Sequence, residues 1–445
     1  MNFLIARLCF VVLTVPIFAS AGSLKEIGSY PLRGDLRLVE HLDNGNWVVS
    51  ERIYVMGQLA KDKGPEITDY YEKITFLKSD FSKIESYKAD GIMESPYFLK
   101  LTAEKEETVV GVSGKGLKRT LHLFSADGKN HYTADLGELD PQAHSIGEPS
   151  TLISPLRNGN VFVDALDKSY VFDRAGKKLG EFQSTPAING AQSLADGTLM
   201  LVTGDKILFL GLDGTEKRKP LEIKRGFYSV DATSDGTVFI SPYSRMGCCG
   251  VDRGSETAYT INPDGTKRSE FTIKGRNGSP TLLGSGKIIA DSTEFVGGKG
   301  EIKKQIMIVD LDGKTTSTVE TSELPYLDNV VVSKTDDLIF LGNNKVMVLD
   351  ASGKTKWVST FEGEQSNPAL LDAENIWTLG FEDLKVHLWD LKTGKEKEVL
   401  SLKDVPELSK QDPDPRQNFE GVFEEGVFAL KTIKDHKVHF IKILN

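Results

Sequence analysis

A short turn recurs along this chain, and an apolar run comes directly before it each time. It reads "FSADGK" from Phe124, "GLDGT" from Gly211, "NPDGT" from Asn262 and "DLDGK" from Asp310, with related copies elsewhere. An Asp or Asn in the turn can accept a hydrogen bond from the backbone two residues later, and Gly supplies the positive φ that closes a hairpin. The recurrence therefore predicts a long series of β-hairpins.

The run before this turn is apolar at two adjacent positions in six of the seven copies. The first position holds Leu123, Val171, Phe209, Thr260, Ile308, Val348 and Leu388, with Thr260 the one exception, and the second holds Phe124, Phe172, Leu210, Ile261, Val309, Leu349 and Trp389. Adjacent residues of a strand point to opposite faces of the sheet. Both faces of this strand must therefore be covered by other layers.

A second kind of turn completes a repeat unit. It reads "DNGN" from Asp43, "ADGT" from Ala195 and "SDGT" from Ser234, and another apolar strand follows it. The unit is strand, turn, strand, loop, strand, turn, strand, and we count nine such units at about 47 residues each, the length of a propeller blade. The sequence predicts an all-β fold, a single β-propeller of eight or nine four-stranded blades over residues 22–445. The last unit lacks a fourth strand, so we expect the N-terminal segment "SLKEIGSYPL" at 23–32 to close the ring.

Residues 1–21 have a different pattern. A single charge at Arg7 is followed by the apolar run Leu8 to Phe18 and then by Ala19-Ser20-Ala21. This order predicts a signal peptide cleaved after Ala21, and hence a periplasmic or secreted protein. The apolar run is too short to span a bilayer, and no later run qualifies. The formal net charge of −10 argues against a nucleic-acid partner, which needs a basic face.

Two units resemble known propeller families. "KVHLWDLKTGK" at 385–395 resembles a WD40 blade, and "VLDASGKTKW" at 348–357 resembles the repeat of quinoprotein-type (PQQ-like) propellers, with Trp357 in the place of their docking tryptophan. The PQQ-like families include quinone dehydrogenases as well as propellers that act as scaffolds without a cofactor. The resemblance therefore implies the fold, and it leaves open both a cofactor-free chain and an enzyme that holds PQQ with calcium.

The candidate binding residues lie in long loops between the second and third strands. Three such segments, at 51–71, 241–257 and 291–304, are much longer than their equivalents and are expected on one rim of the ring. Long loops on a rigid scaffold commonly carry binding sites, and Tyr and Arg are frequent interface anchors. The predicted binding residues are Tyr54, Tyr70, Tyr71, Tyr243, Arg245, Met246 and Arg253.

Cys248 and Cys249 are the only cysteines after the predicted cleavage site. Neighbouring Cα atoms lie about 3.8 Å apart, whereas disulfides prefer roughly 4.4–6.8 Å, so a Cys248–Cys249 disulfide would be strained and easily reduced. Gly247 and Gly250 allow the tight backbone that it needs. Four interpretations stay open: a brace within the loop, a contact or redox element beside a ligand, a soft-metal site with Met246, and a disulfide between chains.

Other motifs point to no chemistry. His122, His387 and His439 occupy one recurrent strand position, where other units place Tyr or Met, so we interpret them as structural rather than as metal ligands. No hydrolase or zinc motif is present in the sequence. The leading hypothesis is a monomeric, non-enzymatic module that binds a protein or cell-envelope component. The alternative is a quinoprotein-type oxidoreductase with the cysteine pair near its cofactor.

Overall fold

A computed structural model gives the architecture of the chain. It describes residues 23–56, 67–90, 92–94, 108–115, 118–138, 152–156, 158–165, 168–185, 188–243, 246–247, 250–251, 257–273, 280–283, 285–296, 301–320, 330–333, 335, 337–342, 345–350, 352–361, 363, 369–381, 383–409, 419–423, 426–432 and 434–444. The predicted signal peptide, residues 1–21, lies outside these ranges.

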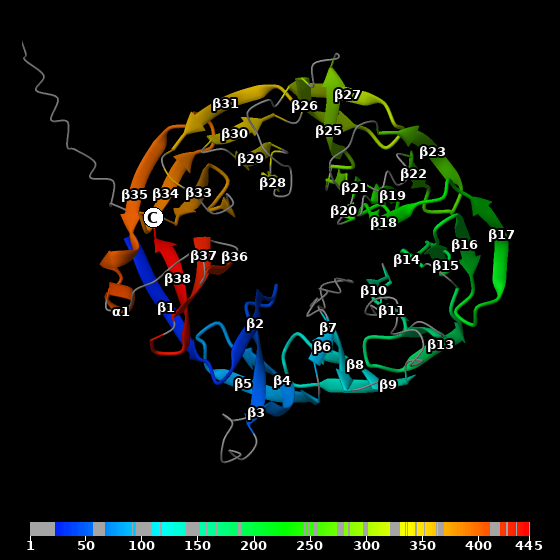
Figure 1. Ribbon diagram of the computed structural model, residues 1–445, viewed down its shortest axis with the longest axis horizontal. Helices are drawn as coiled ribbons and strands as arrows, with labels where there is room; N and C mark the ends of the chain where they lie inside the picture. The colour runs from blue at the N-terminus through cyan, green and yellow to red at the C-terminus, as the bar shows by residue number, and fades with distance from the viewer. Residues whose placement is uncertain are drawn as a thin grey trace, which may run out of the picture.

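Nine four-stranded antiparallel sheets form a ring in the described part of the chain (Figure 1). We number them as blades 1–9 along the sequence. Blade 1 consists of β2 Asp35–His41, β3 Trp47–Met56, β4 Ile67–Leu77 and β5 Lys83–Asp90. Blade 2 consists of β6 Ile92–Glu94, β7 Thr108–Lys115, β8 Lys118–Ser125 and β9 His131–Glu138. Blade 3 consists of β10 Leu152–Pro155, β11 Val161–Asp164, β12 Lys168–Phe172 and β13 Lys178–Gln183.

The middle three blades follow the same order. Blade 4 consists of β14 Gly190–Ser193, β15 Leu199–Val202, β16 Lys206–Leu210 and β17 Glu216–Glu222. Blade 5 consists of β18 Phe227–Ala232, β19 Val238–Tyr243, β22 Thr257–Ile261 and β23 Lys267–Thr272. Blade 6 consists of β24 Thr281–Leu282, β25 Ile288–Val296, β26 Glu301–Val309 and β27 Thr315–Glu320. A separate two-stranded sheet, β20 Met246–Gly247 with β21 Gly250–Val251, lies between β19 and β22 in the sequence.

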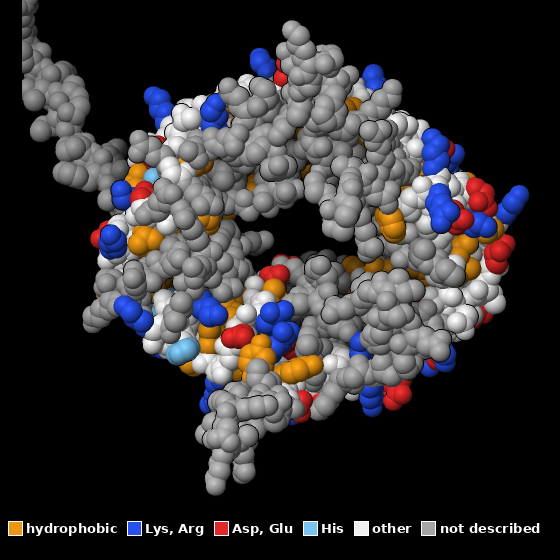
Figure 2. All heavy atoms as spheres, in the orientation of Figure 1, with side chains coloured by type: hydrophobic (Ala, Val, Ile, Leu, Met, Phe, Trp, Pro, Cys, Tyr) orange, Lys and Arg blue, Asp and Glu red, His pale blue; other side chains and the backbone are white. Residues whose placement is uncertain are grey.

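The last three blades complete the ring. Blade 7 consists of β28 Val330–Val332, β29 Leu338–Gly342, β30 Lys345–Leu349 and β31 Thr355–Thr360. Blade 8 consists of β32 Ala369–Leu370, β33 Asn375–Gly380, β34 Lys385–Asp390 and β35 Glu396–Ser401. Blade 9 combines β36 Phe419–Phe423, β37 Val427–Thr432 and β38 Lys437–Leu444 with the N-terminal strand β1 Ser23–Pro31. The ring is open at its centre in the space-filling view (Figure 2). The prediction of eight or nine blades is confirmed, with nine as the number.

The N-terminal strand closes the ring, as the sequence predicted. Strand β1 pairs antiparallel with β38, from Ser23 opposite Leu444 to Pro31 opposite Lys437. Figure 1 shows this blue strand lying beside the red C-terminal strand. Blade 9 thus joins the two ends of the described chain, and the closure depends on these cross-strand hydrogen bonds.

The core is divided among the contacts between blades. In the described residues, nine clusters of buried apolar side chains each span one pair of neighbouring blades. The two predicted apolar positions of the third strand are buried in every copy, from Leu123 and Phe124 to Leu388 and Trp389. Each blade therefore uses both faces, one toward each neighbour, as the prediction of a strand covered on both sides requires.

The predicted turns have the expected backbone. Every glycine that closes a described copy of either turn has positive φ, from 68° at Gly128 and Gly394 to 89° at Gly236. Trp357 on β31 donates an indole N–H hydrogen bond to the carbonyl of Leu391 in the next blade, at 2.7 Å. It also packs against Gly394, where an added Cβ would lie 2.5 Å from its ring. The docking role that the resemblance implied for Trp357 is thus confirmed.

In two of the three predicted long loops, the described residues instead extend a β-hairpin. Pairing of β3 with β4 continues through Glu51–Lys73 to Met56–Ile67, and pairing of β25 with β26 continues to Val296–Glu301. The error arose because these strands run past their neighbours, and strand residues were counted as loop. The short helices η2 Leu402–Asp404 and α1 Pro406–Ser409 lie in the link before blade 9 and were also not predicted.

Among the described residues there is no helix long and apolar enough to cross a membrane.

The turns between first and second strands and between third and fourth strands share one rim, which we call the turn rim. Links between the second and third strands, and between blades, share the opposite rim, which we call the loop rim. These two rims are the surfaces on which candidate sites are compared below.

Candidate functional site

The β3–β4 hairpin of blade 1 extends beyond the sheet that supports it. Pairing of β2 with β3 ends at Asp35–Arg52, and pairing of β4 with β5 ends at Glu72–Ala89. The hairpin continues for four further pairs, from Ile53–Tyr71 to Met56–Ile67. It therefore projects at the loop rim as a two-stranded ribbon.

A buried ion pair fixes the base of this ribbon. The Arg52 Nε donates to Glu72 Oε1 at 2.9 Å, and the Glu72 side chain is only 2% exposed. Burial by itself would lower the pKa of the Arg52 guanidinium, but the hydrogen bond and the charge of Glu72, together with Tyr54, outweigh it and raise the pKa. The pair anchors the ribbon where it leaves the blade.

The structure brings together two of the predicted binding residues. Tyr54 and Tyr70 lie directly opposite each other across the ribbon, so their side chains share one face. Tyr54 is 37% exposed, and its neighbour Val55, on the other face, is 41% exposed. Tyr71 is separated from this pair, because it opposes Ile53 and its ring lies 4.6 Å from the Lys88 ammonium.

The remaining predicted residues belong to the segment between β19 and β22. Tyr243 ends β19 and pairs through its backbone with Phe227. Met246 pairs with Val251, and Gly247 pairs with Gly250, in the small β20–β21 sheet. Arg245, Arg253, Cys248 and Cys249 lie outside the described residues, so the structure does not test the roles predicted for them.

The three histidines of the recurrent strand position are held within their own blades. His122 bonds to Ser113 at 2.7 Å and to His131 at 2.9 Å, and burial lowers the pKa of His122 to about 4. His387 bonds to Glu396 and Asp383, and His439 bonds to Glu26 and Thr432. Their contacts agree with the structural role predicted from the repeat.

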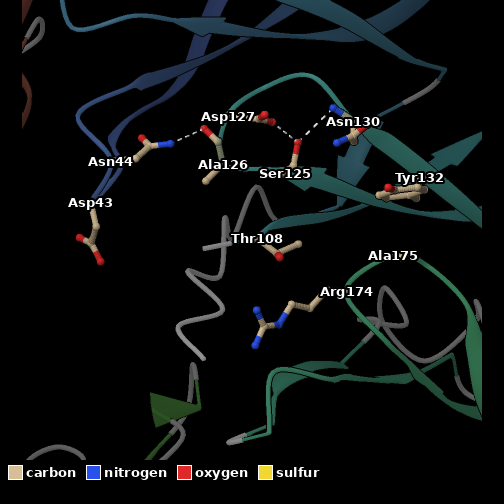
Figure 3. Close-up of a pocket in the computed structure, with 10 residues that line it drawn as sticks. All are labelled: Asp43, Asn44, Thr108, Ser125, Ala126, Asp127, Asn130, Tyr132, Arg174 and Ala175. Atoms are coloured by element: carbon tan, nitrogen blue, oxygen red, sulfur yellow. Dashed lines mark hydrogen bonds between the residues drawn. The ribbon is translucent and has the colours of Figure 1, made fainter. Parts of the chain in front are cut away.

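A pocket of about 680 Å³ lies on the turn rim, where turns from blades 1, 2 and 3 meet (Figure 3). Its described lining is Asp43, Asn44, Thr108, Ser125, Ala126, Asp127, Asn130, Tyr132, Arg174 and Ala175. Asp43 comes from the β2–β3 turn, Asp127 from the β8–β9 turn and Arg174 from the β12–β13 turn. The volume is within the range of roughly 300–1,000 Å³ that small-molecule sites occupy.

This pocket was not predicted, because the predicted binding residues all lie in the long loops of the opposite rim. A signal was available at Arg174, in the turn "FDRAGK". The equivalent position holds Ala126, Leu212, Pro263, Leu311 and Ala351 in other copies, so a charged residue departs from the pattern there. A repeat position that is apolar elsewhere and charged once is a reason to look for a local role.

Comparison with known proteins gives a likeness to solved propellers alone. No family model matches the chain, and no curated protein matches it. BamB from Moraxella catarrhalis is similar in structure at 15% identity and a TM-score of 0.43, over 94% of this chain and 99% of that one. The dihydro-heme d1 dehydrogenase NirN is similar at 13% identity and a TM-score of 0.40, over 74% of this chain and 70% of that one.

A WD40 domain is also among the similar structures. The WD40 domain of Neurospora crassa Pan2 covers 94% of this chain and 94% of its own length, at 9% identity and a TM-score of 0.33. At such identities and scores these likenesses concern the fold alone, and no functional argument rests on them. The strand order of the ring is what establishes the propeller.

Proposed function

We propose that this chain is an exported, monomeric β-propeller that binds a protein or cell-envelope component through its loop rim. Export rests on the signal-peptide pattern of residues 1–21. The single observation that carries the binding role is the β3–β4 ribbon, which presents large apolar side chains beyond the blade. The function is that of a binding or scaffolding module.

The exposed side chains of the ribbon favour a protein contact. Seven large apolar side chains are exposed in the described part of the chain, and two of them, Tyr54 and Val55, are neighbours on the ribbon. Scattered exposed apolar residues are normal on a surface, but Tyr54 and Val55 point to opposite faces of one projecting ribbon, so each face presents an exposed apolar side chain beyond the blade where a partner can contact it. Tyr contributes contact area at little entropic cost, which suits it as an anchor.

The ribbon is also held in a fixed position. Glu51, at its base, is completely buried and accepts hydrogen bonds from Tyr30, Lys73 and the backbone N–H of Arg33. The Arg52–Glu72 pair lies on the other face of the same strands. A preorganised element loses little conformational entropy when it binds, and this favours a useful affinity from a small contact.

A site-specific cross-link tests the proposal. A photoactivatable amino acid is placed at position 54 and, as a matched control, at position 179 on β13, where Leu179 is also 37% exposed. Both proteins are produced with residues 1–21 in the organism that encodes the chain and are irradiated in intact cells. We expect one defined cross-linked protein from position 54 and none from position 179.

Equal cross-linking at the two positions, or none at position 54, would contradict the binding role of the ribbon. The oxidoreductase alternative is tested separately on the purified chain. Addition of PQQ and calcium should yield no dye-linked dehydrogenase activity, and appearance of that activity would favour the enzyme instead.

A further inference from the structure

We propose that the pocket on the turn rim between blades 1, 2 and 3 is a binding site for a short neutral oligosaccharide. This site is separate from the ribbon at the loop rim and does not depend on the function proposed for it. The juxtaposition that carries the inference is a set of polar side chains from three different blades around one hollow (Figure 3).

Part of the pocket wall is fixed by hydrogen bonds between blades. Asn44 of blade 1 donates through Nδ2 to the carbonyl of Ala126 in blade 2 at 2.9 Å. Asn46 donates to the same carbonyl at 3.1 Å. These bonds hold the β2–β3 turn against the β8–β9 turn, so the two walls keep a constant separation when a ligand enters.

The second wall is ordered by the turn itself. The Ser125 hydroxyl donates to Asp127 Oδ1 at 2.6 Å and accepts from the backbone N–H of Asn130 at 3.0 Å. The hydrogen bond from Ser125 lowers the pKa of the Asp127 carboxyl, which therefore stays ionised well below neutral pH. Its Oδ2 atom lies 3.5 Å from the Lys129 ammonium at the rim. The Asp127 Oδ1 atom also accepts from the backbone N–H of Lys129 at 3.0 Å, so this carboxylate is fixed within its turn, and Oδ2 is the oxygen that can accept a further hydrogen bond from a ligand.

The lining offers both donors and acceptors. Thr108 and Asn130 contribute a hydroxyl and an amide, which can donate and accept, and Tyr132 contributes a phenol. Arg174 adds a fork of N–H donors, and Asp43 adds an acceptor from the facing blade. A sugar hydroxyl also donates and accepts at one atom, so a polyhydroxylated ligand matches this mixture better than an apolar one.

The charges of the lining favour a neutral ligand. Among the described residues of the lining the charged side chains are Asp43, Asp127 and Arg174, which leave one net negative charge. An acidic sugar would meet two carboxylates for one guanidinium, so like-charge repulsion would weaken it. The ring of Tyr132, which is 38% exposed, supplies an apolar surface for the C–H face of a sugar ring.

Titration of the intact, purified protein with defined oligosaccharides tests this inference. The neutral probes are cellotriose, maltotriose and the trimer of N-acetylglucosamine, and the acidic probe is trigalacturonate. Calorimetry should show binding of at least one neutral trimer, with trigalacturonate at least tenfold weaker. Arg174→Gln and Asp43→Asn should each weaken the bound trimer at least tenfold.

The matched control is Lys177→Gln, which removes a charge from the same turn as Arg174 but lies outside the pocket lining. It should leave the affinity unchanged, as should Tyr54→Ala on the opposite rim. Absence of binding by all three neutral trimers would overturn the inference. So would binding that survives both pocket substitutions, or preference for the acidic trimer. None of these results bears on the ribbon, because its test is cross-linking at position 54.

Discussion

Removal of the Glu51 carboxylate should loosen the closure of the ring. Glu51 is completely buried on β3, and it accepts a hydrogen bond at 2.8 Å from Tyr30 on the closing strand β1. Lys73 donates to both partners, to Glu51 at 3.1 Å and to the Tyr30 hydroxyl at 2.8 Å. The backbone N–H of Arg33 donates to Glu51 at 2.6 Å. One carboxylate therefore connects blade 1, the closing strand and the link between them.

The magnitude follows from what the substitution leaves behind. Glu51→Ala leaves the Lys73 ammonium without its anion, and breaking a buried ion pair costs about 3–5 kcal/mol. The Lys73 side chain is 23% exposed, so water compensates in part and we expect the lower end, about 3 kcal/mol. Glu51→Gln keeps one acceptor oxygen, but it also removes the anion and turns an NH2 donor toward either the Lys73 ammonium or the backbone N–H of Arg33, so it should cost about as much as Glu51→Ala.

Urea unfolding, followed by tryptophan fluorescence, measures this cost, because Trp47 lies in the same apolar cluster as Tyr30. Hydrogen exchange of β1 measures the opening of the closure itself. Glu51→Ala should speed exchange in β1 more than it speeds exchange in the rest of the ring. Glu181→Ala, which breaks ion pairs to Lys168 and Lys178 on the surface, is the control and should cost less than about 1 kcal/mol. Equal costs for Glu51→Ala and Glu181→Ala would refute the reasoning.

Three further predictions concern the repeats and the cysteines. Gly394→Ala should destabilise the fold by about 2–4 kcal/mol in urea unfolding, because Gly394 has φ of 68° and an added Cβ would lie 2.5 Å from Trp357. Stability should fall by about 3 kcal/mol as the pH drops from 6.5 to 4, because His122 has a pKa of about 4 in the folded protein and its higher, ordinary pKa in the unfolded chain. The unfolded chain therefore binds the proton first and is favoured as the pH drops. His122→Gln should abolish that part of the pH dependence. Intact mass of the exported protein should rise by two hydrogens on reduction if Cys248 and Cys249 are joined, whereas an unchanged mass would exclude their disulfide.

The fold could be predicted in detail because the same turn and strand patterns recur in successive repeat units. Turn glycines, such as Gly214 and Gly313, and the doubly apolar third strand depend on local chemistry that recurs in every blade. Closure by the N-terminal strand followed from counting, because the last unit lacked a strand. The exact blade number could not be settled from the sequence alone, since the first and last units are irregular.

The sites were harder to predict because they arise where the repeat is broken. Strand pairing beyond a blade looks like a loop in the sequence, so the ribbon that carries Tyr54 and Tyr70 was placed in a loop. The docking position was recognised at Trp357, but the packing of side chains against turn glycines was not predicted for Tyr132, Phe182 and Phe271, which contact the glycines of the following blades. Tyr132 follows the turn glycine of its own blade at the same spacing as Trp357 does, whereas Phe182 and Phe271 lie two residues further from the turn glycines of their own blades.

Binding by the β3–β4 ribbon is the central claim, and one affinity measurement tests it most directly. The protein that cross-links at position 54 is purified and titrated against the exported chain, against Tyr54→Ala combined with Val55→Asp, and against Leu179→Asp as the control. We predict at least a tenfold loss of affinity in the double variant and an unchanged affinity in the control. Equal affinity of all three proteins would contradict the claim.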